Sequence, residues 1–500
     1  MNNIIINNKP DASLTWRGLG GHFDSITQII NEFMDNSISN LKSHPELNIK
    51  QIFISIQEIN NGDVTFSIED SGTGFTDLDA AFTLGSQEAQ DSTMNEHGFG
   101  FKHALASVDP DNINWKIYSR SKQQLENGMY TLIEAPYSYT DFTAKEVSNN
   151  EKKWPGLSNS SGTIFTFMCS KLLFKTVRVG VRGTPPGFER HIEYLVEDLA
   201  FTYSDLISDN KAPIRVIAKD MNGVEVCNQT IAALEPDVYE HFNLGKGSQV
   251  LSLDNHSVTV KYEFCFIHSR DDTVKYYKTT MSQSGVEIRL NGRVIAYNLF
   301  KEIWDKEKHN SYNHILIKLN LISDDQNALP STRTSKNGIR KGDKKLDDLF
   351  TWLLQQLPEG PPQSTEPGGG QHETSLFELL KDQKEIHLVP STIKLDRAVF
   401  DSLGYNKIRV DLWQSYNQQL KIYEGKKDVT TLQDVYQLMM YWDGCVIDGH
   451  TPHTGYLIAA SHPQSVKDLL ITINTMKDAS NNNYNFETTT WKKNGVNYPK

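Results

Sequence analysis

The first third of the chain holds residue types suited to binding a nucleotide and a metal ion. Glu32 and Asn36 are four residues apart in a helical segment, so both side chains project from one face of the helix. That spacing places a carboxylate beside a water molecule and an amide oxygen beside Mg²⁺, which prefers oxygen ligands. Such a pair on an amphipathic helix is usually solvated surface, so its meaning depends on the segments that follow.

Two further segments carry matching chemistry. Asp70–Phe75 directly follows a predicted strand, where a carboxylate can accept a hydrogen bond from an exocyclic amine and glycines let the backbone approach a flat ring. Asn95–Ala104 is a glycine-rich turn that enters a helical stretch, where backbone N–H groups form an anion cradle and a lysine adds positive charge. Together and in this order, the three segments predict a nucleotide site more specifically than any one of them alone.

Short strands and one long helix must position these residues. Ile26–Ile38 has apolar residues at a helical period. Two alternating segments, 51–59 and 63–70, predict strands joined by a hairpin at Asn61–Asp63, and Thr163 lies at the start of another strand. Strands intermixed with helices predict an α/β (α+β) fold class.

The motifs ExxDNS, DSGTGF and GFGFKHA, at residues 32–37, 70–75 and 98–104, resemble those of the GHKL superfamily of ATPases. They are most similar to the MORC-like branch, and the resemblance covers about residues 15–175. It implies a Bergerat ATP-binding sandwich that binds ATP and Mg²⁺. The ordinary P-loop pattern is not evident in the sequence.

The resemblance also implies a role for each matching residue. Glu32 is the general base that activates water, and Asn36 is the Mg²⁺ ligand, with Asp35 supporting the metal's water shell. Asp70 recognises the adenine amine, assisted by Thr163. The remaining cofactor-binding positions are Gly72, Gly74, Gly98, Gly100, Phe101 and Lys102.

Residues 186–356 resemble the transducer domain that follows the ATP site in gyrase, MutL and MORC proteins. These ATPases place a lysine from a transducer loop on the γ-phosphate, where a cation offsets charge that develops in the transition state. The loop at residues 328–343 offers Lys336 for this catalytic role. Its competitors are Arg333, Arg340 and Lys341, and a solvated basic loop is the alternative reading. No phosphoacceptor helix of a histidine kinase is apparent, which counts against a signalling kinase.

The end of the chain carries a second set of chemical residues. Asp411 and Glu424 lie on two consecutive predicted strands, and Lys426 shares a strand face with Glu424. Converging carboxylates bind Mg²⁺, and a neighbouring lysine stabilises developing charge on a phosphate. Gln437 and Tyr441 lie one turn apart on the following helix.

This pattern resembles the PD-(D/E)xK nuclease superfamily, with Asp411 and Glu424 as metal ligands and Lys426 and Gln437 beside them. Val410 replaces the proline that usually precedes the aspartate, which leaves open a non-cleaving domain. Glu378 or Glu385 could supply an additional acid. The predicted parts are an ATP-binding domain at 1–185, a transducer-like domain at 186–356, a linker at 357–372 and a nuclease-like domain at 373–500.

Composition narrows the class of protein. The chain has 500 residues, a net charge of −12 and four dispersed cysteines, so we expect a cytoplasmic protein without a disulfide or zinc framework. No apolar run approaches the ~20 residues that span a bilayer, and the first residues lack the pattern of a secretory signal. The acidic charge limits nucleic-acid contact to local basic patches, such as 333–345.

These observations predict an ATPase whose ATP-driven homodimerisation, with residues 1–20 as an exchanged arm, controls a metal-dependent DNA endonuclease. A role in prokaryotic antiphage defence fits this combination of domains, as does an additional protein partner. The alternative is an ATP-switched DNA clamp or chaperone-like remodeller whose C-terminal domain binds without cutting.

Overall fold

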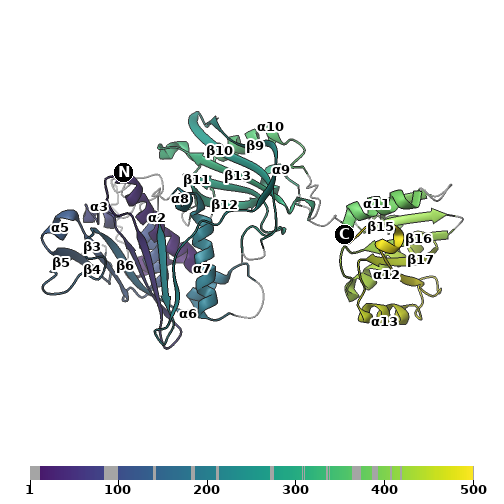
Figure 1. Ribbon diagram of the computed structural model, residues 1–500, viewed down its shortest axis with the longest axis horizontal. Coiled ribbons are helices and arrows are strands. Elements are labelled where there is room, and N and C mark those ends of the chain that lie inside the picture. The colour runs from purple at the N-terminus through teal and green to yellow at the C-terminus, as the bar shows by residue number, and fades with distance from the viewer. Residues whose placement is uncertain are drawn as a thin grey trace, which may run out of the picture. The chain divides into compact units, whose positions relative to one another are not determined.

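A computed structural model describes most of the chain (Figure 1). The described residues are 12–83, 100–138, 142–181, 186–209, 213–270, 275–306, 308, 310–333, 336, 338–362, 373–385, 392–405, 408–416 and 419–498. The chain forms two compact units, Met1–Ser364 and Thr365–Lys500, and the division falls within the predicted linker. In the described residues, no helix combines the length and the apolar character needed to cross a membrane.

The first unit begins with an eight-stranded sheet in the order β5-β4-β3-β6-β2-β1-β7-β8. Its strands are β1 (Ile52–Glu58), β2 (Val64–Asp70), β3 (Trp115–Arg120), β4 (Met129–Glu134), β5 (Lys145–Ser148), β6 (Gly162–Cys169), β7 (Ile214–Lys219) and β8 (Glu225–Thr230). The predicted hairpin is confirmed, because β1 and β2 pair antiparallel on either side of Asn61–Asp63. The predicted ATP-binding domain ends at residue 185. β7 lies beyond that position and pairs with β1 in parallel, so the first sheet includes strands from both sides of it.

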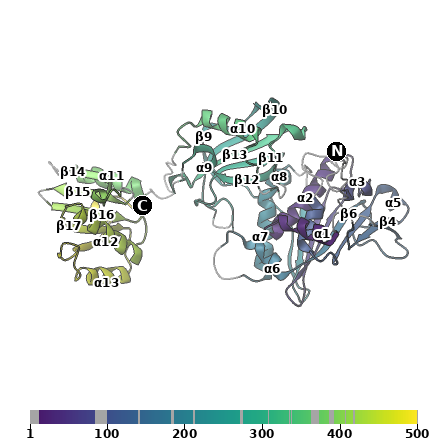
Figure 2. The ribbon, with the colours of Figure 1, turned by 180° about the vertical axis from the view of Figure 1, so that it is seen from behind.

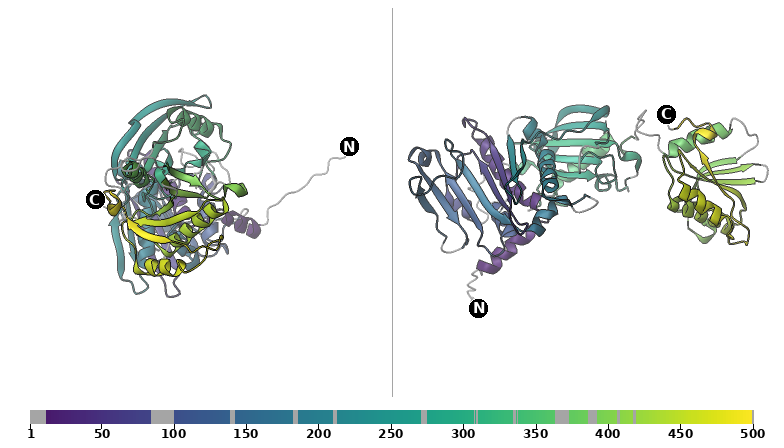
Figure 3. Two further views of the ribbon diagram at one scale, coloured as in Figure 1. Left: turned by 90° about the vertical axis from the view of Figure 1, so that its right-hand side faces the viewer. Right: turned by 60° about the horizontal axis from the view of Figure 1, so that its bottom comes forward.

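Helices cover one face of this sheet, as the views in Figures 2 and 3 show for α1, α2 and α7. The helical elements are α1 (Ala12–Leu19), η1 (Gly20–His22), α2 (Ile26–Ser43), α3 (Leu78–Phe82), α4 (Gly100–Val108), α5 (Lys122–Glu126), α6 (Lys171–Phe174), η2 (Lys175–Arg178), α7 (Phe188–Thr202) and α8 (Ser204–Ser208). α1 packs near the end of α4: the indole N–H of Trp16 donates a hydrogen bond to the carbonyl oxygen of Asp109, which directly follows α4.

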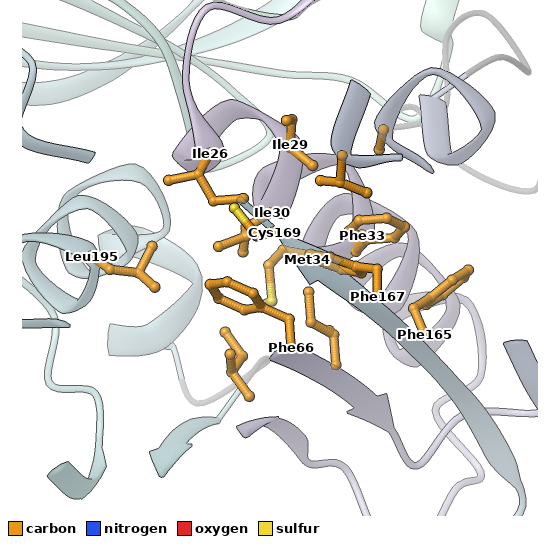
Figure 4. Packing of buried hydrophobic residues seen from close by; sticks show 14 of the residues in the cluster. Ile26, Ile29, Ile30, Phe33, Met34, Phe66, Phe165, Phe167, Cys169 and Leu195 are labelled. Atoms are coloured by element: carbon orange, nitrogen blue, oxygen red, sulfur yellow. The ribbon is translucent and has the colours of Figure 1, made fainter. Parts of the chain in front are cut away.

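α2 forms the centre of the core because its apolar residues recur at a helical period. Ser25 caps the helix by accepting a hydrogen bond from the backbone of Gln28. Phe33 packs against Phe165 and Phe167 of β6, with ring centroids 4.8 and 5.2 Å apart (Figure 4). Burial of each such side chain contributes roughly 1.5–3 kcal/mol, which fixes the helix on the sheet and so fixes the direction of its polar face.

A second, five-stranded sheet completes the first unit in the order β12-β11-β13-β10-β9. Its elements are β9 (Val238–Leu253), β10 (His256–Ile267), β11 (Gly285–Leu290), β12 (Arg293–Leu299), α9 (Lys301–Trp304), η3 (Asn310–Tyr312), β13 (Ile315–Ile322), η4 (Gln326–Ala328) and α10 (Lys344–Gln356). The turn between β11 and β12 is at Asn291 and Gly292, both with positive φ, as glycine and asparagine allow. α10 buries Leu349, Trp352 and Leu353 in the core of this sheet.

The second unit is one five-stranded sheet in the order β14-β15-β16-β17-β18, with β16, β17 and β18 parallel. Its elements are α11 (Glu373–Glu385), β14 (Thr392–Ala398), η5 (Asp401–Leu403), β15 (Arg409–Tyr416), β16 (Gln419–Gly425), α12 (Leu432–Ile447), β17 (Pro452–Ala459), α13 (Gln464–Ile473), β18 (Phe486–Thr490) and η6 (Lys492–Asn494). α11 lies on one face of the sheet, and α12 and α13 lie on the other (Figure 1). The mixed sheets of both units confirm the predicted α/β (α+β) class.

Candidate functional site

The polar face of α2 carries carboxylates that the fold removes from solvent. The Glu32 and Asp35 side chains are almost fully buried. Glu32 Oε1 and Asn36 Nδ2 are buried and have no hydrogen-bond partner among the residues that the structure describes. Because burying an unsatisfied polar atom is costly, these atoms mark a place that suits a polar ligand.

Lys336 reaches this face from the loop between η4 and α10. Its Nζ lies 3.1 Å from Asp35 Oδ2 and 3.3 Å from Glu32 Oε2, and the side chain is buried. Its three competitors, Arg333, Arg340 and Lys341, are exposed. Within the described part of this loop, the lysine favoured by the sequence is therefore the basic side chain brought to α2.

The charged side chains of this cluster shift one another's pKa. Burial raises the pKa of Glu32, and Asp35 raises it further, whereas Lys336 and Arg293 lower it. Burial acts to lower the pKa of Lys336, but Asp35 and Glu32 outweigh that effect and the pKa is raised. Lys336 is therefore held as a cation, and the raised pKa makes Glu32 a stronger base than an exposed glutamate.

Two residues that sequence reasoning missed complete this cluster. Arg293 Nε donates to Asp35 Oδ1 over 2.7 Å, and the Tyr203 hydroxyl donates to the same oxygen over 2.8 Å. The sequence signal for Arg293 was its position at the start of the strand that follows an Asn-Gly turn. Its partner on α2, Asp35, is 258 positions away. No local pattern connects the two.

The Asp70 carboxylate, at the end of β2, is held by hydrogen bonds. Its Oδ1 accepts from the backbone N–H of Gly72 over 2.9 Å, and its Oδ2 accepts from the Ser37 hydroxyl over 3.0 Å. Burial raises the pKa of Asp70 to about 6, although hydrogen bonds from Gly72, Ser37 and the backbone of Thr163 lower it. Thr163 is the cross-strand neighbour of Asp70, so the two predicted adenine-site residues lie together.

The glycines beside Asp70 are required by close contacts. A Cβ on Gly72 would lie 2.1 Å from Asn40 Oδ1, and one on Gly74, which has φ +72°, would lie 2.8 Å from the carbonyl oxygen of Arg120. A side chain at Gly72 would displace the side chains of Asn40 and Asp70, and one at Gly74 would be strained by its positive φ and would displace the backbone of Arg120.

The start of α4 lies against the α2 carboxylates. A Cβ added to Gly100, the first residue of α4, would lie 2.3 Å from Glu32 Oε2. A helix N-terminus favours anions, so this arrangement suits a phosphate near Glu32. Gly98 lies outside the described residues, and Phe101 packs among aromatic rings, 5.4 Å from Phe82.

Lys102 has a different set of partners from those predicted. Its Nζ donates to the carbonyl oxygens of Ala81 and Thr83, each over 2.8 Å, and burial lowers its pKa to about 8. The ammonium thus ties α4 to the end of α3. A contact between Lys102 and a phosphate stays a prediction and would require these two bonds to be released.

The predicted nuclease residues also converge in the second unit. Asp411 of β15 and Glu424 of β16 lie on the sheet face that packs against α12, and Asp411 Oδ2 accepts from the backbone N–H of Gly425 over 2.9 Å. Lys426 Nζ lies 2.5 Å from Glu424 Oε1. Burial and then Asp411 raise the pKa of Glu424 to about 9, although Lys426 acts to lower it.

α12 adds the two residues predicted from its sequence. Gln437 Nε2 donates to the Tyr441 hydroxyl over 2.7 Å. Burial raises the pKa of Tyr441, and the charges of Glu424 and Asp411 raise it further. Glu378 and Glu385 lie on α11, which covers the opposite face of the sheet.

The two units differ in how well they fit a metal ion. On α2, Glu32 Oε1 can accept a hydrogen bond from water and Asn36 Nδ2 can donate one to a phosphate oxygen, whereas the Asn36 amide oxygen is the atom that would hold Mg²⁺. In the second unit Glu424 Oε2 is likewise buried without a partner among the described residues. The described parts of the chain contain no cluster of three or more His, Cys, Asp or Glu side chains that could hold a metal ion. A metal at Asp411 and Glu424 would therefore take its remaining ligands from water or substrate.

Comparison with known proteins assigns a domain type to part of the first unit. Residues 21–144 match the family model described as "Histidine kinase-, DNA gyrase B-, and HSP90-like ATPase". The first unit therefore contains a GHKL-type ATPase domain, which supports binding and hydrolysis of ATP. The match does not extend to the second unit.

Other comparisons are more distant. No curated protein matches the chain. A solved structure titled "Crystal Structure of N terminal domain of a DNA repair protein" matches with 13% sequence identity and a TM-score of 0.41, and the match covers 69% of this chain and 96% of that chain.

Proposed function

We propose that the chain is a MORC-like GHKL ATPase whose nucleotide state controls a metal-dependent DNA endonuclease in its second unit. The contact of Lys336 with Glu32 and Asp35 carries this proposal. Because of this contact, the loop that follows the second sheet supplies a cation to the ATP site. Binding or loss of the γ-phosphate is therefore sensed by a part of the chain that leads directly, through α10, to the linker.

The residues of the first unit divide the work of hydrolysis. Glu32 accepts the proton of the attacking water, and its raised pKa suits that task. Lys336 offsets charge that develops on the γ-phosphate. Asn36 would hold Mg²⁺, which, when bound, supplies further charge neutralisation on the phosphates. Asp70, assisted by Thr163, accepts a hydrogen bond from the adenine amine at the other end of the nucleotide.

The proposal of phosphodiester cleavage rests on the convergence of unlike groups in the second unit. Asp411 and Glu424 would hold the divalent metal, and Lys426 would stabilise negative charge near it. Gln437 and Tyr441 would orient the substrate or water. Arg340, Lys341 and Lys344 are exposed and offer DNA a local basic stripe on an acidic chain.

The experiment uses the purified full-length chain with ATP, Mg²⁺ and plasmid or linear DNA. We expect Glu32→Gln to abolish ATP turnover and ATP-stimulated cleavage, and Glu424→Gln to abolish cleavage while ATP turnover persists. Exposed glutamates give matched controls, Glu46→Gln for the first unit and Glu487→Gln for the second. If the wild-type chain cleaves DNA equally with and without ATP, nucleotide control is wrong.

Dimerisation and biological role belong to the same proposal. ATP-dependent pairing of two chains is tested by light scattering with a non-hydrolysable ATP analogue, with Glu32→Gln expected to accumulate as the dimer in ATP. The defence role rests on the combination of domains. Expression of the wild-type chain, but not of the Glu32→Gln or Glu424→Gln variants, should reduce phage plating.

A second function is favoured by one observation, the absence of a third acidic ligand beside Asp411 and Glu424 in the described residues. An ATP-switched DNA clamp or remodeller would need no cleavage. Absence of cleavage on single-stranded DNA, double-stranded DNA and RNA, together with ATP-dependent retention of circular DNA, would select this function.

A further inference from the structure

We propose that Arg293 is a positioning residue of the ATP site, assisted by Tyr203, and that it sets Lys336 for contact with the γ-phosphate. This inference rests on the proposed ATPase function. It concerns two residues that lie outside the matched 21–144 region. Neither residue touches the nucleotide in this proposal, because both act through Asp35 and Lys336.

The first support is geometric. Arg293 Nε donates to Asp35 Oδ1 over 2.7 Å, and its Nη1 donates to the main-chain carbonyl oxygen of Lys336 over 3.1 Å. One guanidinium therefore joins α2 to the loop that carries Lys336. Lys336 has φ +46°, a left-handed conformation that a side-chain-bearing residue adopts only where its surroundings hold it. The bond from Arg293 to its carbonyl is such a restraint.

The second support is charge balance. Two carboxylates, Glu32 and Asp35, face two cations, Lys336 and Arg293, and all four side chains are buried. When the Lys336 ammonium turns to a γ-phosphate, Asp35 loses one of its two ion pairs. A buried carboxylate without a counter-charge is costly. Arg293 remains on Asp35 and removes that cost, so Lys336 is free to engage the nucleotide.

Tyr203 supplies the third support from a separate element. Its hydroxyl donates to Asp35 Oδ1 over 2.8 Å and lies 3.1 Å from the backbone carbonyl oxygen of Asn31. Tyr203 joins α7 to α8 in the chain, and its ring is fully buried in the core that contains α2. Asp35 is thus held on one oxygen by Arg293 and Tyr203, which leaves its other oxygen to Lys336.

The proposal is tested with Arg293→Met, Lys336→Met and the double variant in the full-length chain. ATP turnover gives kcat and KM, and equilibrium binding of ADP, which lacks the γ-phosphate, reports on the rest of the site. We expect Arg293→Met to lower kcat about 100-fold, as loss of one electrostatic group does. KM and ADP affinity should change less than about threefold, and the double variant should be no slower than Lys336→Met alone, because coupled residues are not additive. Arg215→Met, at an exposed arginine on β7, is the matched control and should leave turnover unchanged.

Milder variants keep the test decisive if Arg293→Met fails to fold. Tyr203→Phe removes a single hydroxyl and should lower kcat about three- to tenfold at unchanged ADP affinity. Arg293→Lys keeps the charge but cannot reach both Asp35 and the carbonyl, so it should restore part of the turnover. A parallel loss of kcat and ADP affinity in these variants would show a merely structural role and overturn the proposal.

The outcomes separate this inference from the function on which it rests. If Glu32→Gln abolishes turnover and Lys336→Met strongly lowers it while the Arg293 and Tyr203 variants match the wild type, the positioning role alone is overturned. Additive losses in the double variant would likewise overturn it. If the wild-type chain does not hydrolyse ATP, or Glu32→Gln hydrolyses it normally, the proposed ATPase function fails first.

Discussion

Lys336 Nζ lies 3.3 Å from Glu32 Oε2, although the two residues are 304 positions apart in the chain. The carboxylate comes from α2, which packs on the first sheet, and the ammonium comes from a loop beyond the second sheet. The GHKL-type match ends at residue 144, so this cation is supplied from outside the matched domain. The candidate ATP site is complete only when the two sheets of the first unit pack together.

Replacement of Lys336 should move the pH dependence of ATP turnover. Lys336 lowers the pKa of Glu32, so Lys336→Met raises it further. A general base works only when deprotonated, and turnover is therefore lost as pH falls through its pKa. We expect the acidic limb of the residual kcat profile of Lys336→Met to lie at a higher pH than that of the wild type. A limb at an unchanged pH would contradict the coupling of these two groups.

Gly100→Ala should impair hydrolysis by steric displacement of Glu32. The added Cβ would lie 2.3 Å from Glu32 Oε2, so the carboxylate must move. Alanine favours a helix over glycine by up to about 1 kcal/mol, so the variant should lose turnover, by about tenfold or more, without losing thermal stability. Gly18→Ala, in α1 with no atom within 4 Å of its Cβ, is the matched control. Equal turnover in both variants would exclude the contact.

Asp70→Asn should change both stability and base preference. In the folded chain the pKa of Asp70 is about 6, above its ordinary value of 3.8, so the folded state binds the proton more tightly than the unfolded state does. The contribution of Asp70 to the free energy of unfolding therefore falls as pH rises from about 4 to about 6. Asparagine does not titrate, so the stability of the wild type relative to Asp70→Asn should fall over that range in chemical denaturation.

The same variant tests recognition of the base. Loss of the carboxylate should weaken ATP binding about tenfold, equivalent to one hydrogen bond. Binding of inosine triphosphate, which has no exocyclic amine, should change little. Equal weakening for both nucleotides would place Asp70 in a structural role only.

Removal of metal or of Lys426 should abolish DNA cleavage by the second unit. Chelation by EDTA should stop cleavage, and added Mg²⁺ should restore it. Lys426→Ala should lower the cleavage rate at least 100-fold because the ammonium 2.5 Å from Glu424 is lost. Lys421→Ala is the matched control, since Lys421 lies on the same strand beside Tyr456 and is directed away from Glu424. Cleavage that survives both Lys426→Ala and chelation would remove the proposed nuclease site.

Local sequence patterns determined several elements of the fold and several residues of the candidate sites. The apolar period of α2, the Asn61–Asp63 hairpin and the motif spacings that place Glu32, Asn36 and Asp70 all act over a few residues. For the same reason Asp411 and Glu424 could be predicted to lie side by side, because they belong to one antiparallel pair of strands. The family match at residues 21–144 agrees with that local information.

Tertiary structure decided the contacts that join distant segments. Burial selected Lys336 from four basic residues of one loop. Packing of the second sheet brought Arg293 to Asp35, and packing of the segment that joins α7 to α8 against α2 brought Tyr203 there. It also gave Lys102 two backbone carbonyls as partners. The physical reason is that charge pairing in a buried site depends on which surfaces meet, and neither helical period nor strand alternation encodes that meeting.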